Sequence, residues 1–173
     1  KKVVGDNRVL GFIILGMIII MQAPLLLFGL GRQVMPVDYP KDWSEVNNHI
    51  IANQEAFMGN QSRECKDTIL FLPWHMYMGF HWIGRTVANP ARLFFACPII
   101  QGTNMEWGGI YDNSLDPVGQ KIETWLFDRK DVGFLRENGL DITYIMLAKE
   151  VDWQEYAWLD GLLGLKIEKE TDK

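Results

Sequence analysis

The sequence is poor in the residues that build metal centres and redox sites. Its 173 residues include three histidines and two cysteines, and it has no CxxC pair. His75 and His81 are six residues apart and His49 lies on a separate segment, so the ligand spacing of a zinc site is missing. We therefore expect no metal and no other cofactor.

Positive charge is also in short supply. The chain has 17 Lys and Arg against 22 Asp and Glu, a formal net charge of -5. Proteins that bind nucleic acid need clustered Lys and Arg to contact phosphates, so nucleic acid is excluded as a partner. A hydrophobic content of 48% also excludes a disordered chain.

Charged side chains are missing altogether from Val9 to Gly31. These 23 residues would extend about 34 Å as an α-helix, which exceeds the roughly 30 Å hydrocarbon core of a bilayer. The segment is apolar on all sides, as a helix in lipid is, and it is longer than the apolar core of a signal peptide. The sequence therefore predicts an N-terminal flank and transmembrane helix over residues 1–31, kinked near Pro24.

The charges around this segment indicate its orientation. Lys1, Lys2 and Arg8 precede it, which places the N-terminus in the cytoplasm. The residues after it carry 14 basic against 21 acidic side chains, a formal charge of -7. We expect a cell-membrane protein whose C-terminal domain is extracytoplasmic. There, Cys65 and Cys97 either pair or serve as small buried side chains.

The remaining sequence predicts an extended linker followed by an α/β domain. Pro36 and Pro40 favour an extended linker over residues 32–41. Within the domain, residues 42–173, apolar periodicity predicts helices over 42–58, after Asp116-Pro117, near 131–138 and over 152–159. Continuous apolar runs predict buried strands over 68–73 and 142–148, and residues 165–169 alternate like an edge strand. These elements indicate a three-layer-like fold with a mixed or parallel sheet.

Residues 73–116 are the candidate functional region, because they fit neither a helical nor a strand period well. Between Trp74 and Tyr111 there are eight aromatic rings in 38 residues. Flat rings interspersed with polar side chains are typical of carbohydrate sites, although the same rings also suit a core or a bilayer interface. The candidate substrate-binding residues are Trp74, His75, Trp82, Arg85, Asn89, Asn104, Glu106, Trp107 and Asp112.

No catalytic residue can be assigned from the sequence. Ser62 and Ser114 lack a neighbouring base, and Gly108-Gly109 lacks the lysine of a phosphate-binding loop. Asp152 and Glu155 are better explained as the N-terminal cap of a helix than as a catalytic carboxylate pair.

Four segments occur in an order that resembles a known family. They are Pro36–Pro40 with Trp43, Leu70–His75, Gly84–Ala91 and Glu106–Ile110. Together they are similar to the C-terminal region of YfhO-like, 6-pyruvoyl-tetrahydropterin-synthase-related multi-pass membrane proteins, which resemble GT-C glycosyltransferases.

The resemblance implies that the chain is the C-terminal portion of a polytopic glycosyltransferase-like protein. Its last transmembrane helix would precede an extracytoplasmic α/β domain that helps bind a lipid-linked sugar or a glycan acceptor. The catalytic acid of the family would lie outside this chain, so the chain alone would not be catalytic, and its partners would include the bilayer and other transmembrane helices. The alternative is a single-pass anchored binding or structural module, or an accessory subunit without catalysis.

Overall fold

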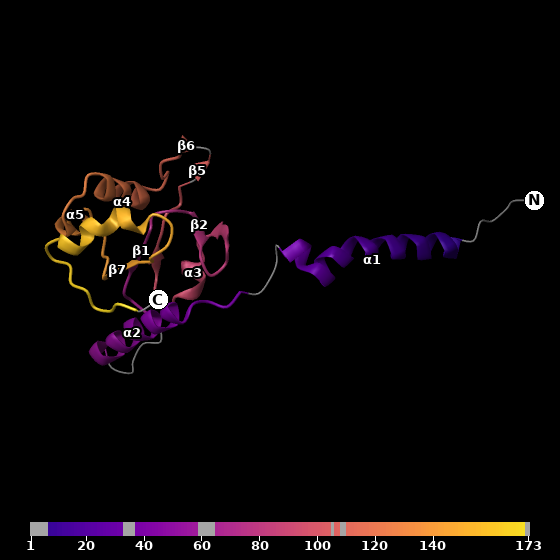
Figure 1. Cartoon of the computed structure of the whole chain (residues 1–173), viewed down its shortest axis with the longest axis horizontal. Helices are drawn as coiled ribbons and strands as arrows, with labels where there is room; N and C mark the ends of the chain where they lie inside the picture. Colours follow the sequence, from indigo (N-terminus) through magenta and orange to yellow (C-terminus); the bar gives the residue numbers. More distant parts are fainter. Residues whose placement is uncertain (1–6, 33–36, 59–64, 105, 108–109, 172–173) are drawn as a thin grey trace, which may run out of the picture. The chain divides into compact units, whose positions relative to one another are not determined.

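The computed structural model describes residues 7–32, 37–58, 65–104, 106–107 and 110–171 (Figure 1). The chain divides into two compact units, Lys1–Asp38 and Tyr39–Lys173. The second unit carries the α/β fold, and each unit is considered by itself below.

The described part of the first unit is the helix α1 (Asn7–Arg32). The sequence predicts that this segment crosses a membrane, and that prediction is wrong. Among the described residues, no helix combines the length and the apolar character that a bilayer span requires. A span needs about 20 consecutive, predominantly apolar residues, and Gln22 and Pro24 interrupt the apolar run that starts at Val9.

A three-stranded parallel sheet forms the centre of the second unit. Its order is β4 (Ile99–Ile100), β1 (Ile69–Leu72) and β7 (Tyr144–Leu147), with Ile69 paired to both Ile99 and Tyr144. All four residues of β1 are buried, as the continuous apolar run predicts. Because the strands are parallel, their carboxyl ends lie at one edge of the sheet.

Helices cover both faces of this sheet. Ile69 and Phe71 pack on one face with Trp43 and Ile50 of α2 (Lys41–Met58). The hairpin of β2 (Tyr77–Phe80) and β3 (Arg85–Ala88) joins that cluster.

The opposite face is covered by α4 (Pro117–Phe127), α5 (Val132–Glu137) and the 3₁₀ helix η1 (Trp153–Gly161). Leu70 and Leu72 point to this face, because successive strand residues alternate between the two faces. The α/β part of the predicted fold, with three layers and a parallel sheet, is therefore present. The remaining short elements are α3 (Ala91–Phe94), β5 (Glu106–Trp107) and β6 (Ile110–Tyr111).

Local signals in the sequence fix several helix ends. Asp116 accepts hydrogen bonds from the backbone N–H groups of Val118 and Gly119, at 3.0 and 2.8 Å, and so caps α4. Gly139 follows α5 with a φ of +74°, a conformation that glycine adopts without strain. The predicted helix over 42–58 and the predicted strands over 68–73 and 142–148 are likewise confirmed, within one or two residues at most of their ends.

The predicted helix over 152–159 is present as the 3₁₀ helix η1 (Trp153–Gly161). The predicted cap is wrong, because Asp152 makes no side-chain cap bond and its carboxylate contacts His75 instead. The predicted strand is also wrong, because residues 165–169 form no strand. In that segment Leu165 packs into the core while Ile167 is 72% exposed, so the alternating residues do not share one buried face.

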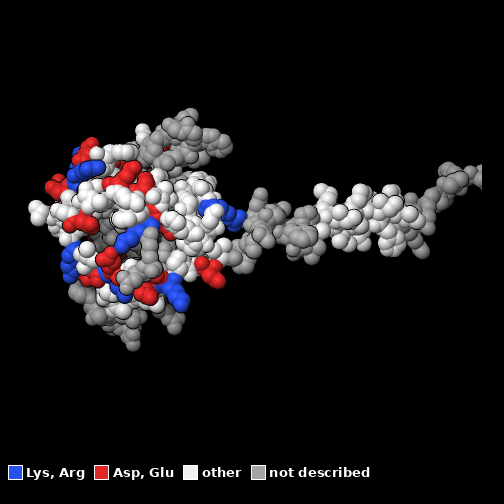
Figure 2. Space-filling model, viewed as in Figure 1, with Lys and Arg blue, Asp and Glu red and all other residues white. Residues whose placement is uncertain are grey.

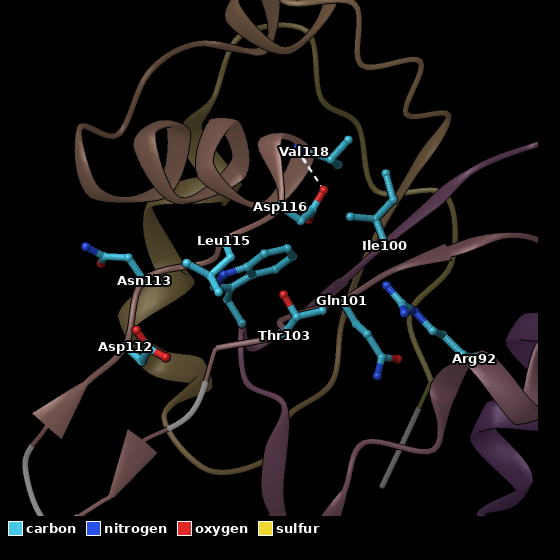
Figure 3. A pocket seen from close by; sticks show the side chains of 10 residues that line it. Arg92, Ile100, Gln101, Thr103, Asp112, Asn113, Leu115, Asp116 and Val118 are labelled. Carbon is cyan, nitrogen blue, oxygen red and sulfur yellow. Dashed lines mark hydrogen bonds between the residues drawn. The ribbon is translucent and has the colours of Figure 1, made fainter.

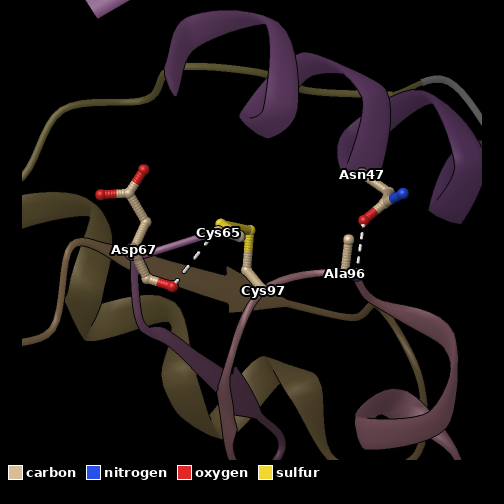
Figure 4. The surroundings of a disulfide bond; sticks show 5 residues. All are labelled: Asn47, Cys65, Asp67, Ala96 and Cys97. Atoms are coloured by element: carbon tan, nitrogen blue, oxygen red, sulfur yellow. Dashed lines mark hydrogen bonds between the residues drawn. A yellow bond between two sulfur atoms is a disulfide. The ribbon is translucent and has the colours of Figure 1, made fainter. Parts of the chain in front are cut away.

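A disulfide joins Cys65 and Cys97, with their Cα atoms 4.8 Å apart (Figure 4). It links the segment that precedes β1 to the segment that precedes β4. Next to it, the Asn47 side chain of α2 accepts a hydrogen bond from the backbone N–H of Ala96 at 3.1 Å. Of the two roles that the sequence leaves open for these cysteines, pairing is therefore the one found.

Candidate functional site

A cavity of about 580 Å³ lies beyond the carboxyl ends of β1 and β4 (Figure 3). Trp74 follows β1, Gln101 follows β4 directly, and the start of α4 contributes Asp116 and Val118. In open α/β sheets, ligands bind outside the carboxyl ends of the strands. The lining residues are Trp74, Arg92, Ile100, Gln101, Thr103, Asp112, Asn113, Leu115, Asp116 and Val118.

The loop after β4 holds two buried side-chain amides whose polar atoms are not all hydrogen-bonded to described residues. Gln101 is 8% exposed, and its Nε2 donates to the carbonyl of Asn89 at 3.1 Å, which fixes the orientation of the amide. Its Oε1 has no partner among the described residues, and both side-chain polar atoms of Asn104 lack one too. An unpaired buried polar group costs about 1–3 kcal/mol. Three side-chain polar atoms of this loop therefore make no hydrogen bond to the described residues.

A buried carboxylate holds two walls of the cavity together. Glu123 of α4 is 5% exposed and accepts hydrogen bonds from the Trp74 indole N–H at 3.3 Å and from the Ser114 backbone N–H at 3.1 Å. The Ser114 hydroxyl lies 3.0 Å from the Thr103 hydroxyl. The loop after β1, the segment before α4 and the loop after β4 are thus connected through the side chains of Glu123 and Ser114.

Gly102 allows the loops after β1 and β4 to touch. A Cβ atom at this position would lie 2.6 Å from the backbone nitrogen of His75 and 2.8 Å from the carbonyl carbon of Trp74. Backbone atoms cannot move aside as a flexible side chain can. The close approach of the two loops beside the cavity therefore requires glycine here.

The loop after β7 reaches the loop after β1 through a histidine–carboxylate pair. Nε2 of His75 lies 3.0 Å from Oδ2 of Asp152, and both side chains are partly buried. Burial alone would raise the pKa of Asp152, but the hydrogen bond and the charge of His75 outweigh it and hold that pKa below its usual value.

A second histidine–carboxylate pair joins the same two segments. Glu150 accepts hydrogen bonds from the His81 ring and, at 3.0 Å, from the His81 backbone N–H. Val151, between the two carboxylates, has a φ of +49°, which is unusual for a β-branched residue. The two pairs therefore hold a strained turn against the segment that leads from β1 through β2 to His81.

We expect Asp152→Asn to lower the free energy of unfolding by about 1 kcal/mol at pH 6, because it removes a partly buried, charge-assisted pair. The pKa of Asp152 is lowered in the folded chain, so its contribution is complete above the ordinary aspartate value of about 3.9 and is lost as the pH falls through the folded value. Urea unfolding at pH 6 and pH 2.5 measures the difference. The exposed Asp160→Asn is the control, and a difference between wild type and Asp152→Asn that does not shrink at pH 2.5 would contradict this assignment.

The structure brings some of the sequence-based candidates together. Trp74 and Asp112 line the cavity, and His75 follows Trp74 but pairs with Asp152 on the side of β7. Asn104 lies in the loop after β4 and is 3% exposed. The side chains of Glu106 and Trp107 fall outside the described part, although their backbone forms β5.

Three other candidates lie away from the cavity lining. Trp82 packs against Trp43 and Phe80, with ring centroids 5.7 and 5.4 Å away. Arg85 lies on the exposed strand β3. Asn89 is buried, where its side-chain oxygen accepts from the Ala91 N–H and its carbonyl holds Gln101, so it supports the cavity from behind.

Sequence reasoning missed five polar residues of the lining. They are Arg92, Gln101, Thr103, Asn113 and Asp116, the last of which was assigned only as a helix cap. The polar run from Gln101 to Asn104 follows a strand of two residues, Ile99–Ile100. That strand is too short to show a period, but a polar run directly after two isoleucines is the signal that could have identified the loop.

Comparison of the chain with family models, with curated proteins and with solved structures finds no match.

Proposed function

We propose that the second unit binds a glycan in the cavity beyond β1 and β4, as the binding domain of a glycosyltransferase-like protein. The observation that carries the proposal is the set of exposed polar side chains in the cavity lining, Thr103, Asp112 and Asn113, beside the exposed Leu115. A ligand hydroxyl can both donate to and accept from such groups.

The chemistry of the lining favours a ligand that both donates and accepts hydrogen bonds. Asp112 can only accept, Arg92 can only donate, and the Thr103 hydroxyl and the Asn113 amide can do both. Ile100, Leu115 and Val118 add apolar surface to the same cavity. Sugars match this combination, because each hydroxyl donates and accepts while the C–H faces of the ring are apolar.

Two observations support the class of protein and the cellular compartment that we propose. The order of motifs in the sequence resembles that of GT-C-like membrane glycosyltransferases, in which such a domain follows the catalytic part. The Cys65–Cys97 disulfide is typical of a compartment outside the reducing cytoplasm. We therefore propose an extracytoplasmic domain that holds a sugar substrate and does not itself catalyse transfer.

We expect Asn113→Ala to weaken glycan binding about fivefold, because the hydrogen bonds of one exposed amide in the lining are lost. Titration calorimetry of the full chain with neutral di- and trisaccharides of glucose, mannose and galactose measures the change. The control is Gln120→Ala, an exposed amide on α4 outside the cavity lining, which should leave affinity unchanged. Equal affinities for wild type and Asn113→Ala would contradict the proposal.

A second pair of variants avoids any effect on folding. Leu115 and Leu163 are each 89% exposed, but only Leu115 lines the cavity. We expect Leu115→Ala to weaken binding about threefold and Leu163→Ala to have no effect, with both unfolding like the wild type. If both variants bind like the wild type, or if no saccharide binds the wild-type chain at all, the proposed function is wrong.

A further inference from the structure

We infer that the sugar entering the cavity is uncharged, so that the site holds the acceptor glycan rather than the phosphate-bearing end of a sugar donor. This inference rests on the proposed function and narrows its substrate class. It concerns the charge of the group that enters the cavity and follows from the groups that surround it.

Among the described residues, the formally charged side chains of the lining are two carboxylates and one guanidinium. Asp112 and Asp116 carry the negative charges and Arg92 the positive one, and none of these described lining residues is a lysine. Figure 3 shows Arg92 and Asp112 on opposite sides of the cavity, so the guanidinium does not neutralise that carboxylate by direct contact. A phosphate would therefore meet an excess of negative charge.

The start of α4 would ordinarily be the place for an anion, because the first N–H groups of a helix are unpaired and its dipole is positive there. In this chain Asp116 already occupies that position. One oxygen of its carboxylate accepts from the Val118 N–H and the other from the Gly119 N–H (the bond to Val118 is drawn in Figure 3). The helix terminus thus presents a carboxylate, and not free N–H groups, toward the cavity.

Arg92 is held in a position that suits a hydroxyl as well as an anion. Its Nε donates to the Ile99 carbonyl at 3.2 Å, which ties the guanidinium to β4. Its remaining N–H groups can donate to a sugar oxygen. The Asp112 carboxylate can only accept, and a fully ionised phosphate has no donor to offer it, whereas a sugar hydroxyl has one.

The test compares each neutral saccharide with its 1-phosphate, using the full chain and titration calorimetry at 50 and 500 mM NaCl. We expect the neutral saccharide to bind at least tenfold more tightly, with an affinity that salt leaves unchanged. Asp112→Asn should raise the affinity for the 1-phosphate about threefold, whereas Asp141→Asn, the same charge change at an exposed position outside the lining, should not.

The outcomes separate this inference from the proposed function. If the 1-phosphates bind as tightly as the neutral saccharides or more tightly, the inference is overturned while glycan binding stands. If Asp112→Asn and Asp141→Asn change the affinity for the 1-phosphate equally, the local charge of the cavity does not select the ligand and the inference is also overturned. If neither kind of saccharide binds, the proposed function itself fails.

Discussion

Replacing Trp125 by alanine should lower the free energy of unfolding of the second unit by about 3–5 kcal/mol, which is typical of a fully buried tryptophan. Trp125 is 0% exposed, and its ring packs against Trp158 with centroids 5.4 Å apart. Its indole N–H donates to the carbonyl of Asp131 at 3.1 Å and so ties α4 to the start of α5. The substitution would leave a cavity between these two helices and remove one of the two hydrogen bonds that the Asp131 carbonyl accepts.

Urea unfolding followed by circular dichroism measures this loss. Phe127→Ala is the matched control, because Phe127 lies on the same helix and is 67% exposed. We expect that control to lose less than about 1 kcal/mol. Similar losses for the two variants would mean that α4 does not pack against the sheet through the face that contains Trp125.

The second large effect is expected at Glu123. Glu123→Ala removes the acceptor of the Trp74 indole N–H and of the Ser114 backbone N–H. Two buried donors without a partner correspond to a loss of about 2–4 kcal/mol in unfolding free energy. Because both partners adjoin the cavity, we also expect glycan affinity to fall at least tenfold.

Glu123→Gln separates the role of the acceptor from that of the charge. The glutamine keeps one oxygen that can accept both hydrogen bonds, so it should lose less than half as much stability as Glu123→Ala and keep most of the affinity. Glu137→Ala, at an exposed position on α5, should change stability by no more than about 0.5 kcal/mol. A Glu123→Ala chain that binds saccharides like the wild type would contradict the positioning role of Glu123.

The sequence predicts well those parts of the fold that local patterns specify. The run Ile69–Leu72 is apolar without interruption because both faces of β1 are covered, and that pattern marks a central strand of a parallel sheet. Asp116-Pro117 and Gly139 mark helix ends because cap geometry needs those residue types. In contrast, the strand Ile99–Ile100 has only two residues, and long-range pairing with β1 defines it.

The candidate site is less predictable because it depends on contacts between distant residues. The sequence predicts that Asp152 caps a helix, but its side chain pairs with His75, 77 residues away. Trp82 and Trp74 are equivalent as aromatic residues in a polar stretch, but only Trp74 lines the cavity. The unpaired oxygen of Gln101 is visible only once the packing of Asn89 against it is known.

The most direct test of glycan binding in the cavity beyond the carboxyl ends of β1 and β4 is a ¹⁵N NMR titration of the full chain with a neutral trisaccharide. The account predicts that the largest shift changes fall on the backbone amides of residues 101–104, 112–116 and 118, on the Asn113 side-chain amide and on the Trp74 indole N–H. Shift changes centred instead on the aromatic cluster around Trp82, or no saturable change at millimolar saccharide, would contradict it.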